Sequence, residues 1–168
     1  RNTLRYEYHM VLLMVDVDDL KALNDNHGHL AGDQALRRVG KLLLHSTRLT
    51  DIVGRFGGDE FLVALPQTDE EGARVVLERF FKSLASSPVE LEGKSLTVHC
   101  SVGAAVIAAP PSRRDAAPHP IPASYFPNVA EALIQTADEA LYKAKSSGKN
   151  RFVFSTHVMS WPEITGTD

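Results

Sequence analysis

Two adjacent carboxylates lie between two short apolar runs in the stretch VGRFGGDEFLVAL, residues 53–65. The apolar runs predict two β-strands, and the glycine pair between them, Gly57 and Gly58, favours a two-residue hairpin turn with positive φ angles. Nothing in a hairpin requires Asp59 and Glu60 at its tip. Their carboxylate oxygens are hard ligands of the kind that Mg²⁺ prefers, so the tip is a candidate metal site.

A third carboxylate, Asp16, ends the continuous apolar run at residues 9–16, which predicts a strand covered on both faces. If this strand lies beside the hairpin, Asp16 shares one rim with Asp59 and Glu60. Like charges packed this closely repel one another and raise each other's pKa unless a cation lies among them. The alternative is that the hairpin carboxylates are solvated turn residues, because short motifs also occur by chance.

The elements that must position these residues follow from the periodicity of apolar residues. In order, we expect a strand at 9–16, a helix capped by Asp33 and ending near Ser46, strands at 52–56 and 61–65, a helix at 69–86, a strand at 96–107, a helix at 129–149 stopped by Gly148, and a strand at 151–154. This order predicts an α+β fold that resembles the ferredoxin-like or palm-type arrangement, in which helices cover one face of an antiparallel sheet.

Length and composition bound the remaining possibilities. The 168 residues, 43% of them apolar, suit one domain, which we place at 1–157 with a Pro/Ala-rich loop insertion at 108–127 and a C-terminal tail at 158–168. The net charge of −3 argues against nucleic acid as a partner. A single cysteine and the lack of a long apolar run favour the cytoplasm. Because the chain begins at Arg1, we expect it to be part of a longer protein.

Five separated motifs occur along residues 10–154 in the order DVDDLKALND, GHLAGD, RLTD, GRFGGDEF and ADEALYKAKSSGKN. In this combination the sequence resembles the GGDEF family of diguanylate cyclases. The resemblance implies an enzyme that condenses two GTP molecules into cyclic di-GMP with release of two pyrophosphates. It also implies that the full-length protein carries an N-terminal sensory or regulatory domain and could be anchored in the membrane through that region.

The resemblance implies roles for the carboxylates and for one lysine. Asp16, the backbone carbonyl of Val17, and Asp59 resemble the ligands of Mg²⁺ or Mn²⁺, two ions per active site, with Glu60 as a further ligand. Asp59, Glu60 and Lys21 are the expected catalytic residues, and Lys21 resembles the residue that meets the triphosphate. The alternative for Lys21 is an ordinary solvated lysine.

Substrate-binding roles follow from the same resemblance. Asn24 and Asp33 resemble the pair that hydrogen-bonds the guanine edge. Adenine offers no matching pair of donors, so it would leave the Asp33 carboxylate without hydrogen-bond donors and would be rejected. Asp33 also suits a helix N-cap, and both roles can hold together. Lys145 and Lys149 match positions that bind phosphates, although lysines near a helix C-terminus are also ordinary partners of the helix dipole.

The implied reaction is two-metal phosphoryl transfer, in which a ribose 3′-hydroxyl attacks the α-phosphate of a second GTP. Because each chain holds one GTP, catalysis requires an isologous homodimer. The first alternative is an inactive GGDEF domain that acts as a receptor for GTP or cyclic di-GMP. The second alternative is a cyclase acting on ATP, which Asn24 and Asp33 argue against.

RLTD, residues 48–51, resembles the inhibitory RxxD site at which the family binds its own product. An arginine can grip a phosphate or stack on guanine, and an aspartate three residues later can accept from the guanine edge. The candidates are Arg48 and Asp51, with Arg79 as a weaker contact supplied from the other subunit. The alternative is an exposed arginine beside a turn-forming aspartate.

Overall fold

The computed structural model describes residues 9–108 and 125–160. The elements in chain order are β1 (Met10–Val17), α2 (Leu20–His27), α3 (His29–Ser46), β2 (Ile52–Arg55), β3 (Glu60–Pro66), α4 (Glu70–Ala85), β4 (Val89–Leu91), β5 (Lys94–Leu96), β6 (Cys100–Ala108), α5 (Tyr125–Ser146), β7 (Arg151–Phe154) and β8 (Met159–Ser160). None of the helices in these two segments is long and apolar enough to cross a membrane.

The main sheet has the strand order β2-β3-β1-β6-β7, and β8 pairs with the far end of β6. The pairs from β2 to β6 are antiparallel, whereas β7 and β8 run parallel to β6. The continuous apolar run of β1 places this strand at the centre of the sheet, where both of its faces are buried. The predicted α+β class with a mostly antiparallel sheet is therefore confirmed.

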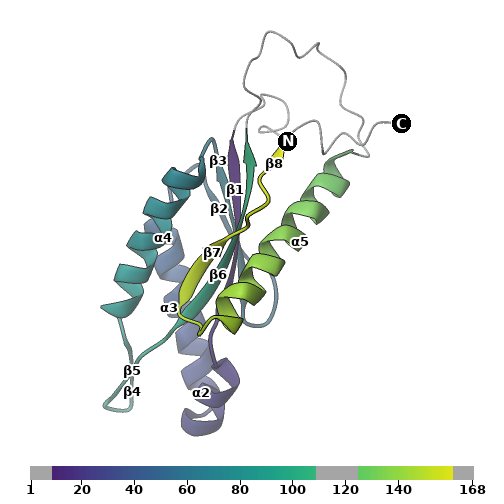
Figure 1. The fold of residues 1–168 in the computed structure, drawn as a ribbon. Helices are drawn as coiled ribbons and strands as arrows, with labels where there is room; N and C mark the ends of the chain where they lie inside the picture. The colour runs from purple at the N-terminus through teal and green to yellow at the C-terminus, as the bar shows by residue number, and fades with distance from the viewer. Residues whose placement is uncertain (1–8, 109–124, 161–168) are drawn as a thin grey trace, which may run out of the picture.

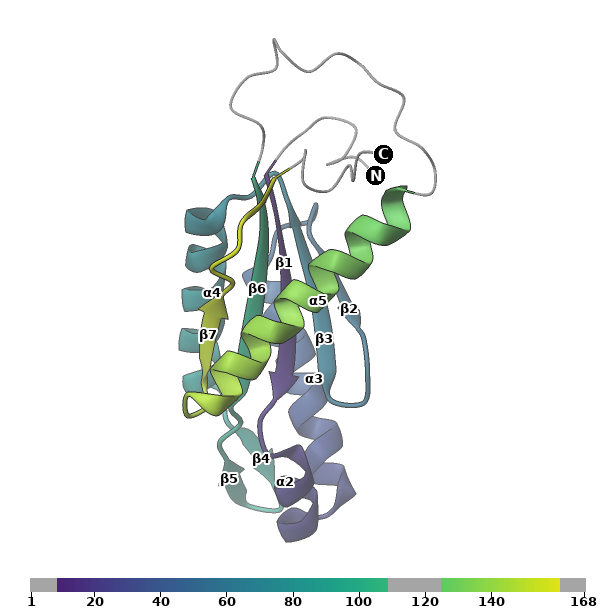
Figure 2. The same ribbon diagram turned by 45° about the vertical axis from the view of Figure 1, so that its right-hand side comes forward.

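Helices cover both faces of this sheet, so the molecule has three layers (Figures 1 and 2). Alternate residues of β1, such as Leu13 and Val15, pack with α3 and α4 in one core. The residues between them, Leu12 and Met14, pack with α5 in a second core on the opposite face. The helices α3 and α4 cover one face, as in the ferredoxin-like core, and α5 of the additional α-β unit, predicted at 129–149, covers the other face.

A glycine on β6 sets how closely α5 approaches the sheet. A Cβ atom at Gly103 would meet backbone atoms of Ala137 and Leu141, so only glycine leaves room for this helix. Both residues are buried in the α5 core. The same helix carries Lys145 near its C-terminal end, so its packing on β6 also positions a predicted substrate-binding residue.

The segment that follows β1 differs from the sequence prediction in two ways. The sequence pattern predicted a helix capped by Asp33, but α3 begins at His29 with Gly28 as its N-cap residue, and Asp33 lies inside the helix. A separate helix, α2, precedes it and was not predicted. Because α2 has no fully buried side chain, it leaves no apolar periodicity in the sequence.

Three further boundaries differ from the sequence prediction. The predicted strand at 96–107 begins only at Cys100, and a short hairpin of β4 and β5 precedes it. Of the predicted insertion at 108–127, Ala108 belongs to β6 and residues 125–127 to α5, while residues 109–124 lie outside the described residues. Met159 and Ser160, assigned to the C-terminal tail, pair with β6 as β8.

The predicted turn at Gly57 and Gly58 is also different. Neither glycine has a positive φ angle, so the type of two-residue turn inferred from the sequence is absent. Because Arg55 pairs with Phe61 and the Phe56 N–H donates to the Glu60 carbonyl at 2.9 Å, the two strands are joined by a longer loop. At Gly57 the missing side chain leaves space for the Glu60 carboxylate, whereas an added Cβ at Gly58 would meet no atom within 4 Å.

Candidate active site

The candidate site lies at the end of β1, where the sheet places two neighbouring strands beside Asp16. Asp16 pairs in register with Glu60 of β3 on one side and with Ser101 of β6 on the other. The N–H of Val17 donates to the carbonyl of Asp59 at 3.1 Å, which ties the hairpin loop to β1. The predicted rim of Asp16, Asp59 and Glu60 is therefore formed by strand pairing.

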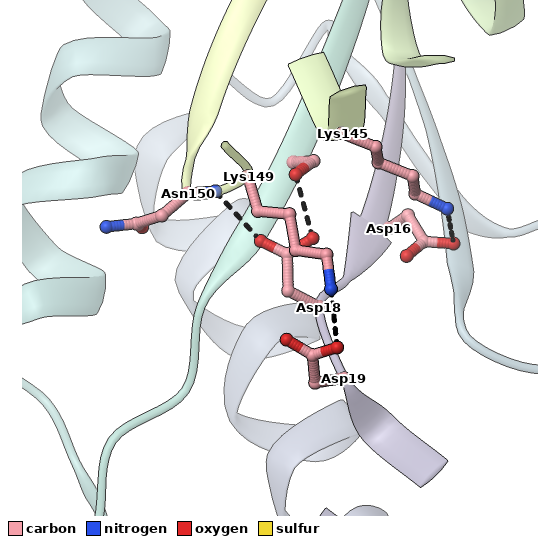
Figure 3. Close-up of polar contacts among 7 residues, drawn as sticks. Asp16, Asp18, Asp19, Lys145, Lys149 and Asn150 are labelled. Carbon is pink, nitrogen blue, oxygen red and sulfur yellow. Dashed lines mark hydrogen bonds and ion pairs between the residues drawn. The ribbon is translucent and has the colours of Figure 1, made fainter. Parts of the chain in front are cut away.

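Asp16 is an unusual carboxylate because it is 94% buried beside two others. Its pKa is raised above the ordinary value, first by burial and further by the negative charges of Asp59 and Glu60. Lys145 opposes this shift, since its Nζ lies 3.0 Å from the Asp16 carboxylate (Figure 3). A cation is thus already drawn to the carboxylate that was predicted to bind one.

The hairpin loop is held by its own side chains. Arg55 donates from Nε to the carbonyl of Gly57 at 3.2 Å and from a terminal nitrogen to the carbonyl of Gly58 at 2.5 Å. A Cβ atom at Gly57 would lie 2.9 Å from a carboxylate oxygen of Glu60, so the missing side chain leaves room for that carboxylate. These contacts fix the loop that presents Asp59 beside β1.

The predicted guanine-reading pair lies on α2 and α3. The Asn24 side-chain oxygen accepts from the N–H of Gly32 at 3.0 Å, and a Cβ atom at Gly32 would collide with the same amide. Because the oxygen is engaged by a donor, the amide NH₂ group of Asn24 is the part left to meet a ligand. Asp33 follows Gly32 and is exposed. The pair therefore offers a donor and an acceptor close together.

The three predicted phosphate-binding lysines lie on different elements. Lys21 is exposed in the first turn of α2. Lys145 pairs with Asp16, while Lys149, in the turn after α5, places its Nζ 2.6 Å from Asp19 (Figure 3). The hydrogen bond to Asp19 is the main reason that the pKa of Lys149 is raised. Both pairing lysines thus lie close to the acidic end of β1.

The sequence analysis missed Asp18 and Ser101, which join the end of β1 to β6. The Ser101 hydroxyl donates to one carboxylate oxygen of Asp18 at 2.7 Å. The second oxygen accepts from the backbone N–H of Asn150 at 3.0 Å. In the run DVDD, the sequence analysis selected Asp16 as a ligand and gave Asp18 no role. No sequence pattern links Asp18 to Ser101, which lies 83 positions later.

The donors at the rim are suitable for a divalent cation. Asp16, Asp59 and Glu60 supply carboxylate oxygens and Val17 supplies a carbonyl, a set that fits Mg²⁺ or Mn²⁺ and not a soft metal. Within residues 9–108 and 125–160, no three side chains of the Asp, Glu, His or Cys type converge as a ready-made metal cluster. Lys145 forms an ion pair with Asp16 at the same place.

The RLTD segment forms a small structured turn between α3 and β2. The backbone N–H of Arg48 donates to one carboxylate oxygen of Asp51 at 2.7 Å. The other oxygen of Asp51 is buried and has no hydrogen-bond partner among the described residues. Arg79 reaches the carbonyl of Ser46 at 3.5 Å in the same chain. Within one chain, Arg79 therefore reaches the C-terminal end of α3, just ahead of the RLTD turn, and its contribution from the other subunit stays a prediction.

Sequence comparison shows which family has this combination of fold and rim. The family profile described as "Diguanylate cyclase, GGDEF domain" matches residues 1–118. The chain belongs to the GGDEF family.

Two curated relatives and one solved structure are similar to the chain. Diguanylate cyclase DgcP of Pseudomonas aeruginosa is 36% identical over 84% of this chain and 19% of its own length. Diguanylate cyclase A of Treponema denticola is 33% identical over 86% of this chain and 34% of its own length. The crystal structure of diguanylate cyclase SiaD with its activator SiaC, from P. aeruginosa, gives a TM-score of 0.75 at 35% identity, covering 91% of this chain and 52% of that one. The chain thus spans a fifth to a third of these curated relatives.

Proposed function

We propose that this domain is a catalytically competent diguanylate cyclase that condenses two GTP molecules into cyclic di-GMP and releases two pyrophosphates. The observation that carries the proposal is the acidic rim, in which the buried Asp16 is paired in register with Glu60 and lies beside the Asp59 loop. Keeping a desolvated carboxylate next to two others costs stability, and Lys145 offsets only part of this cost, since the pKa of Asp16 is still raised. An inactive receptor has no need of this arrangement, whereas a cyclase uses it to bind a divalent cation.

The rim residues would hold the metal ions of the reaction. Asp16 and Asp59 are the proposed ligands through their carboxylates, Val17 through its carbonyl, and Glu60 as a further carboxylate. Two bound Mg²⁺ or Mn²⁺ ions supply the chemistry of lowering the pKa of a ribose 3′-hydroxyl and neutralising the leaving pyrophosphate. The rim itself orients the oxygen ligands, and the bonds from Arg55 to the loop keep Asp59 in place.

Lysines are proposed to neutralise the triphosphate. Lys145 and Lys149 pair with carboxylates in this structure, at 3.0 and 2.6 Å, and both ammonium groups are accessible enough to exchange a carboxylate for a phosphate oxygen. Lys21, exposed at the start of α2, is the third proposed contact and the catalytic lysine. These flexible cations can follow the triphosphate as it is bound and as pyrophosphate leaves.

Guanine selectivity is proposed to come from Asn24 and Asp33. The Asn24 oxygen is held by Gly32, so its NH₂ group is free to donate to the guanine carbonyl. Asp33 can then accept from the guanine N1–H and the exocyclic amine. Adenine presents the opposite pattern on this edge, with a donor where guanine has its carbonyl and an acceptor at N1. All three bonds would be lost, and two pairs of like groups would face each other: the two donors at Asn24 and the two acceptors at Asp33.

Each chain has one such site, so joining two GTP molecules requires two chains whose sites face each other in an isologous homodimer. We place this domain at residues 1–157 of the chain and expect it to act in the cytoplasm. The relatives are three to five times longer than the part that matches, which supports an additional regulatory region in the full-length protein.

Product inhibition at the RLTD turn is the second part of the proposal. Asp51 accepts from the Arg48 N–H through one oxygen, and its other oxygen has no hydrogen-bond partner among the described residues, so a change in the turn that exposes this oxygen would let it accept from a guanine donor. The exposed guanidinium of Arg48 can bind a phosphate of the product, and Arg79 of the same chain reaches the neighbouring backbone. Cyclic di-GMP bound there would hold the two domains out of register without competing with GTP.

The test is the exchange of Asp59 for Ala in the purified domain, compared with Glu71→Ala on the exposed side of α4 as a matched loss of one carboxylate. We expect Asp59→Ala to abolish cyclic di-GMP formation with the fold intact by circular dichroism, because a metal ligand is lost, and Glu71→Ala to retain the parent rate. Turnover at the parent rate by Asp59→Ala would overturn the proposed role of the rim. Binding of GTP or cyclic di-GMP without turnover by the parent would favour the receptor.

A further inference from the structure

We propose that Asp18 is a positioning residue that clamps the turn after α5 and thereby places Lys149 at the triphosphate, beside Lys145 of α5. The inference rests on the proposed cyclase function, and it assigns a role to a residue that neither binds the metal nor touches substrate. The clamp joins three distant segments of the chain: the end of β1, the start of β6, and the turn that leads into β7 (Figure 3).

Both carboxylate oxygens of Asp18 are used within the protein. One accepts from the hydroxyl of Ser101, which is fully buried, and the other accepts from the N–H of Asn150. The Asp18 N–H in turn donates to the carbonyl of His99 at 2.9 Å. Asp18 is therefore fixed on β6 and holds the turn through its second oxygen.

The turn that Asp18 holds has an unfavourable backbone. Gly148, Lys149 and Asn150 have consecutive positive φ angles of 114°, 59° and 46°. Gly148 adopts such an angle without strain and asparagine tolerates it better than most residues, so the conformational cost falls mainly on Lys149. Such a turn persists only when surrounding contacts hold it, and the bond from Asn150 to Asp18 joins it to another part of the chain.

The position of Lys149 depends on this turn. Lys149 belongs to the turn itself, whereas Lys145 lies one helical turn earlier on α5 and is positioned by the packing of that helix on β6. With the turn held, Lys149 reaches Asp19, close to the Lys145–Asp16 ion pair at the end of β1. Without the clamp, the turn can relax toward negative φ angles, and the ammonium group of Lys149 loses its fixed approach to a bound triphosphate.

Asp18 is not free to act as a metal ligand in this arrangement. Its two oxygens face donors on β6 and on the turn, and a cation at either oxygen would have to displace a hydrogen bond. Triphosphate binding and metal binding should therefore respond differently to the loss of Asp18. Loss of the clamp should weaken triphosphate binding and leave the affinity for metal unchanged.

The experiment compares Asp18→Ala, Asp18→Asn and the matched control Asp25→Ala, which removes an exposed carboxylate from α2. An asparagine can keep both bonds, because its oxygen accepts from the Asn150 N–H and its NH₂ group donates to Ser101. Alanine removes both. The readouts are hydrogen exchange at the Asn150 amide by NMR, equilibrium binding of a GTP analogue with a methylene group between its α- and β-phosphates, Mn²⁺ affinity, and the separate kcat and KM values for GTP.

For Asp18→Ala we expect hydrogen exchange at the Asn150 amide to be at least about tenfold faster. The dissociation constant of the analogue and the KM for GTP should each rise about tenfold, as expected for the loss of one charge-assisted contact. Mn²⁺ affinity should stay within about twofold of the parent. Asp18→Asn should stay within about threefold of the parent in every readout, and Asp25→Ala should match the parent. Should Asp18→Ala fail to fold, Ser101→Ala removes one of the two bonds and should give an intermediate gain in amide exchange.

An unprotected Asn150 amide in the parent would overturn the clamp, as would unchanged analogue binding in a folded Asp18→Ala protein. A loss of Mn²⁺ affinity in Asp18→Asn equal to that in Asp18→Ala would make Asp18 a metal ligand instead. A parent that makes no cyclic di-GMP would overturn the proposed function alone, because amide exchange and analogue binding still decide whether the clamp exists.

Discussion

Replacing Gly103 by Ala tests how the sheet positions the active site. Gly103 lies in the middle of β6, under α5, and an added Cβ would lie 2.8 Å from the Cα of Leu141 and closer still to the backbone of Ala137 and Leu141. Ordinary van der Waals contact begins at 3.4 Å. The obstructing atoms belong to backbone, so no side-chain rotation relieves the clash and the whole helix must move away from the sheet.

The expected cost follows from this geometry. Overpacking of a well-packed core costs about 1–3 kcal/mol, and a rigid helix backbone favours the upper end, about 3 kcal/mol. For a chain of this size, each kcal/mol lowers the midpoint of thermal unfolding by about 2–4 °C, so a loss of about 6–12 °C is expected. At 25 °C the fraction of cyclase activity lost should exceed the fraction of protein unfolded, because the displaced α5 carries Lys145 away from Asp16.

The assay is thermal and urea unfolding followed by circular dichroism, with Gly54→Ala as the matched control. Gly54 also lies in a strand, but it is exposed and has no atom within 4 Å of an added Cβ. The control should change stability by less than about 1 kcal/mol. A Gly103→Ala protein as stable and active as Gly54→Ala would refute the close packing of α5 on β6.

Three further predictions concern single carboxylates and one arginine. Asp33→Ser should relax discrimination against ATP, because the acceptor that opposes adenine is removed, and competition between GTP and ATP in turnover measures this. Equal use of both nucleotides by the parent would contradict it. Arg48→Ala should raise product yield at long times with little change in initial rate; equal affinity of parent and variant for cyclic di-GMP by calorimetry would rule out the inhibitory site. The pKa of the Asp16 carboxyl group is raised in the folded state, so the folded protein binds a proton at Asp16 more tightly than the unfolded chain does. Protonated Asp16 therefore stabilises the fold at low pH, and this stabilisation is lost as the pH rises from 3.8, the ordinary pKa, through the folded-state pKa. Urea unfolding without metal should therefore show that Asp16→Asn gains stability over the parent near pH 7 and less at pH 4, and a constant difference would contradict the cause assigned to the shift.

Local apolar patterns were sufficient to predict the sheet and two of its helices. The continuous apolar run of β1 predicted a central strand, and the stripe along α4 predicted a helix that the structure has at Glu70–Ala85 with Asp69 as its cap. The pattern failed for α2, which buries no side chain fully, and for the start of α3, where Gly28 and not Asp33 is the cap. Elements that bury little leave little periodicity in a sequence.

The acidic rim was predictable because it requires only that two strands be neighbours. Asp16 ends one strand and Glu60 begins the other, so antiparallel pairing brings them together. The contacts of Lys145, Lys149 and Asp18 were not predictable, because they depend on the packing of α5 and on the left-handed turn after it. The two-residue turn was wrong for a related reason: glycine pairs also serve close approach, as at Gly57.

Identification of the product by mass spectrometry tests the central claim most directly. The purified 168-residue chain is incubated with GTP and Mg²⁺ at several protein concentrations, and the nucleotides are separated by chromatography and identified by their masses. Diguanylate cyclase activity predicts cyclic di-GMP with two pyrophosphates for each product, at a specific rate that rises with protein concentration because two chains must meet. Intact GTP at every concentration, with GTP or cyclic di-GMP still binding to the domain, would contradict the account and leave a receptor.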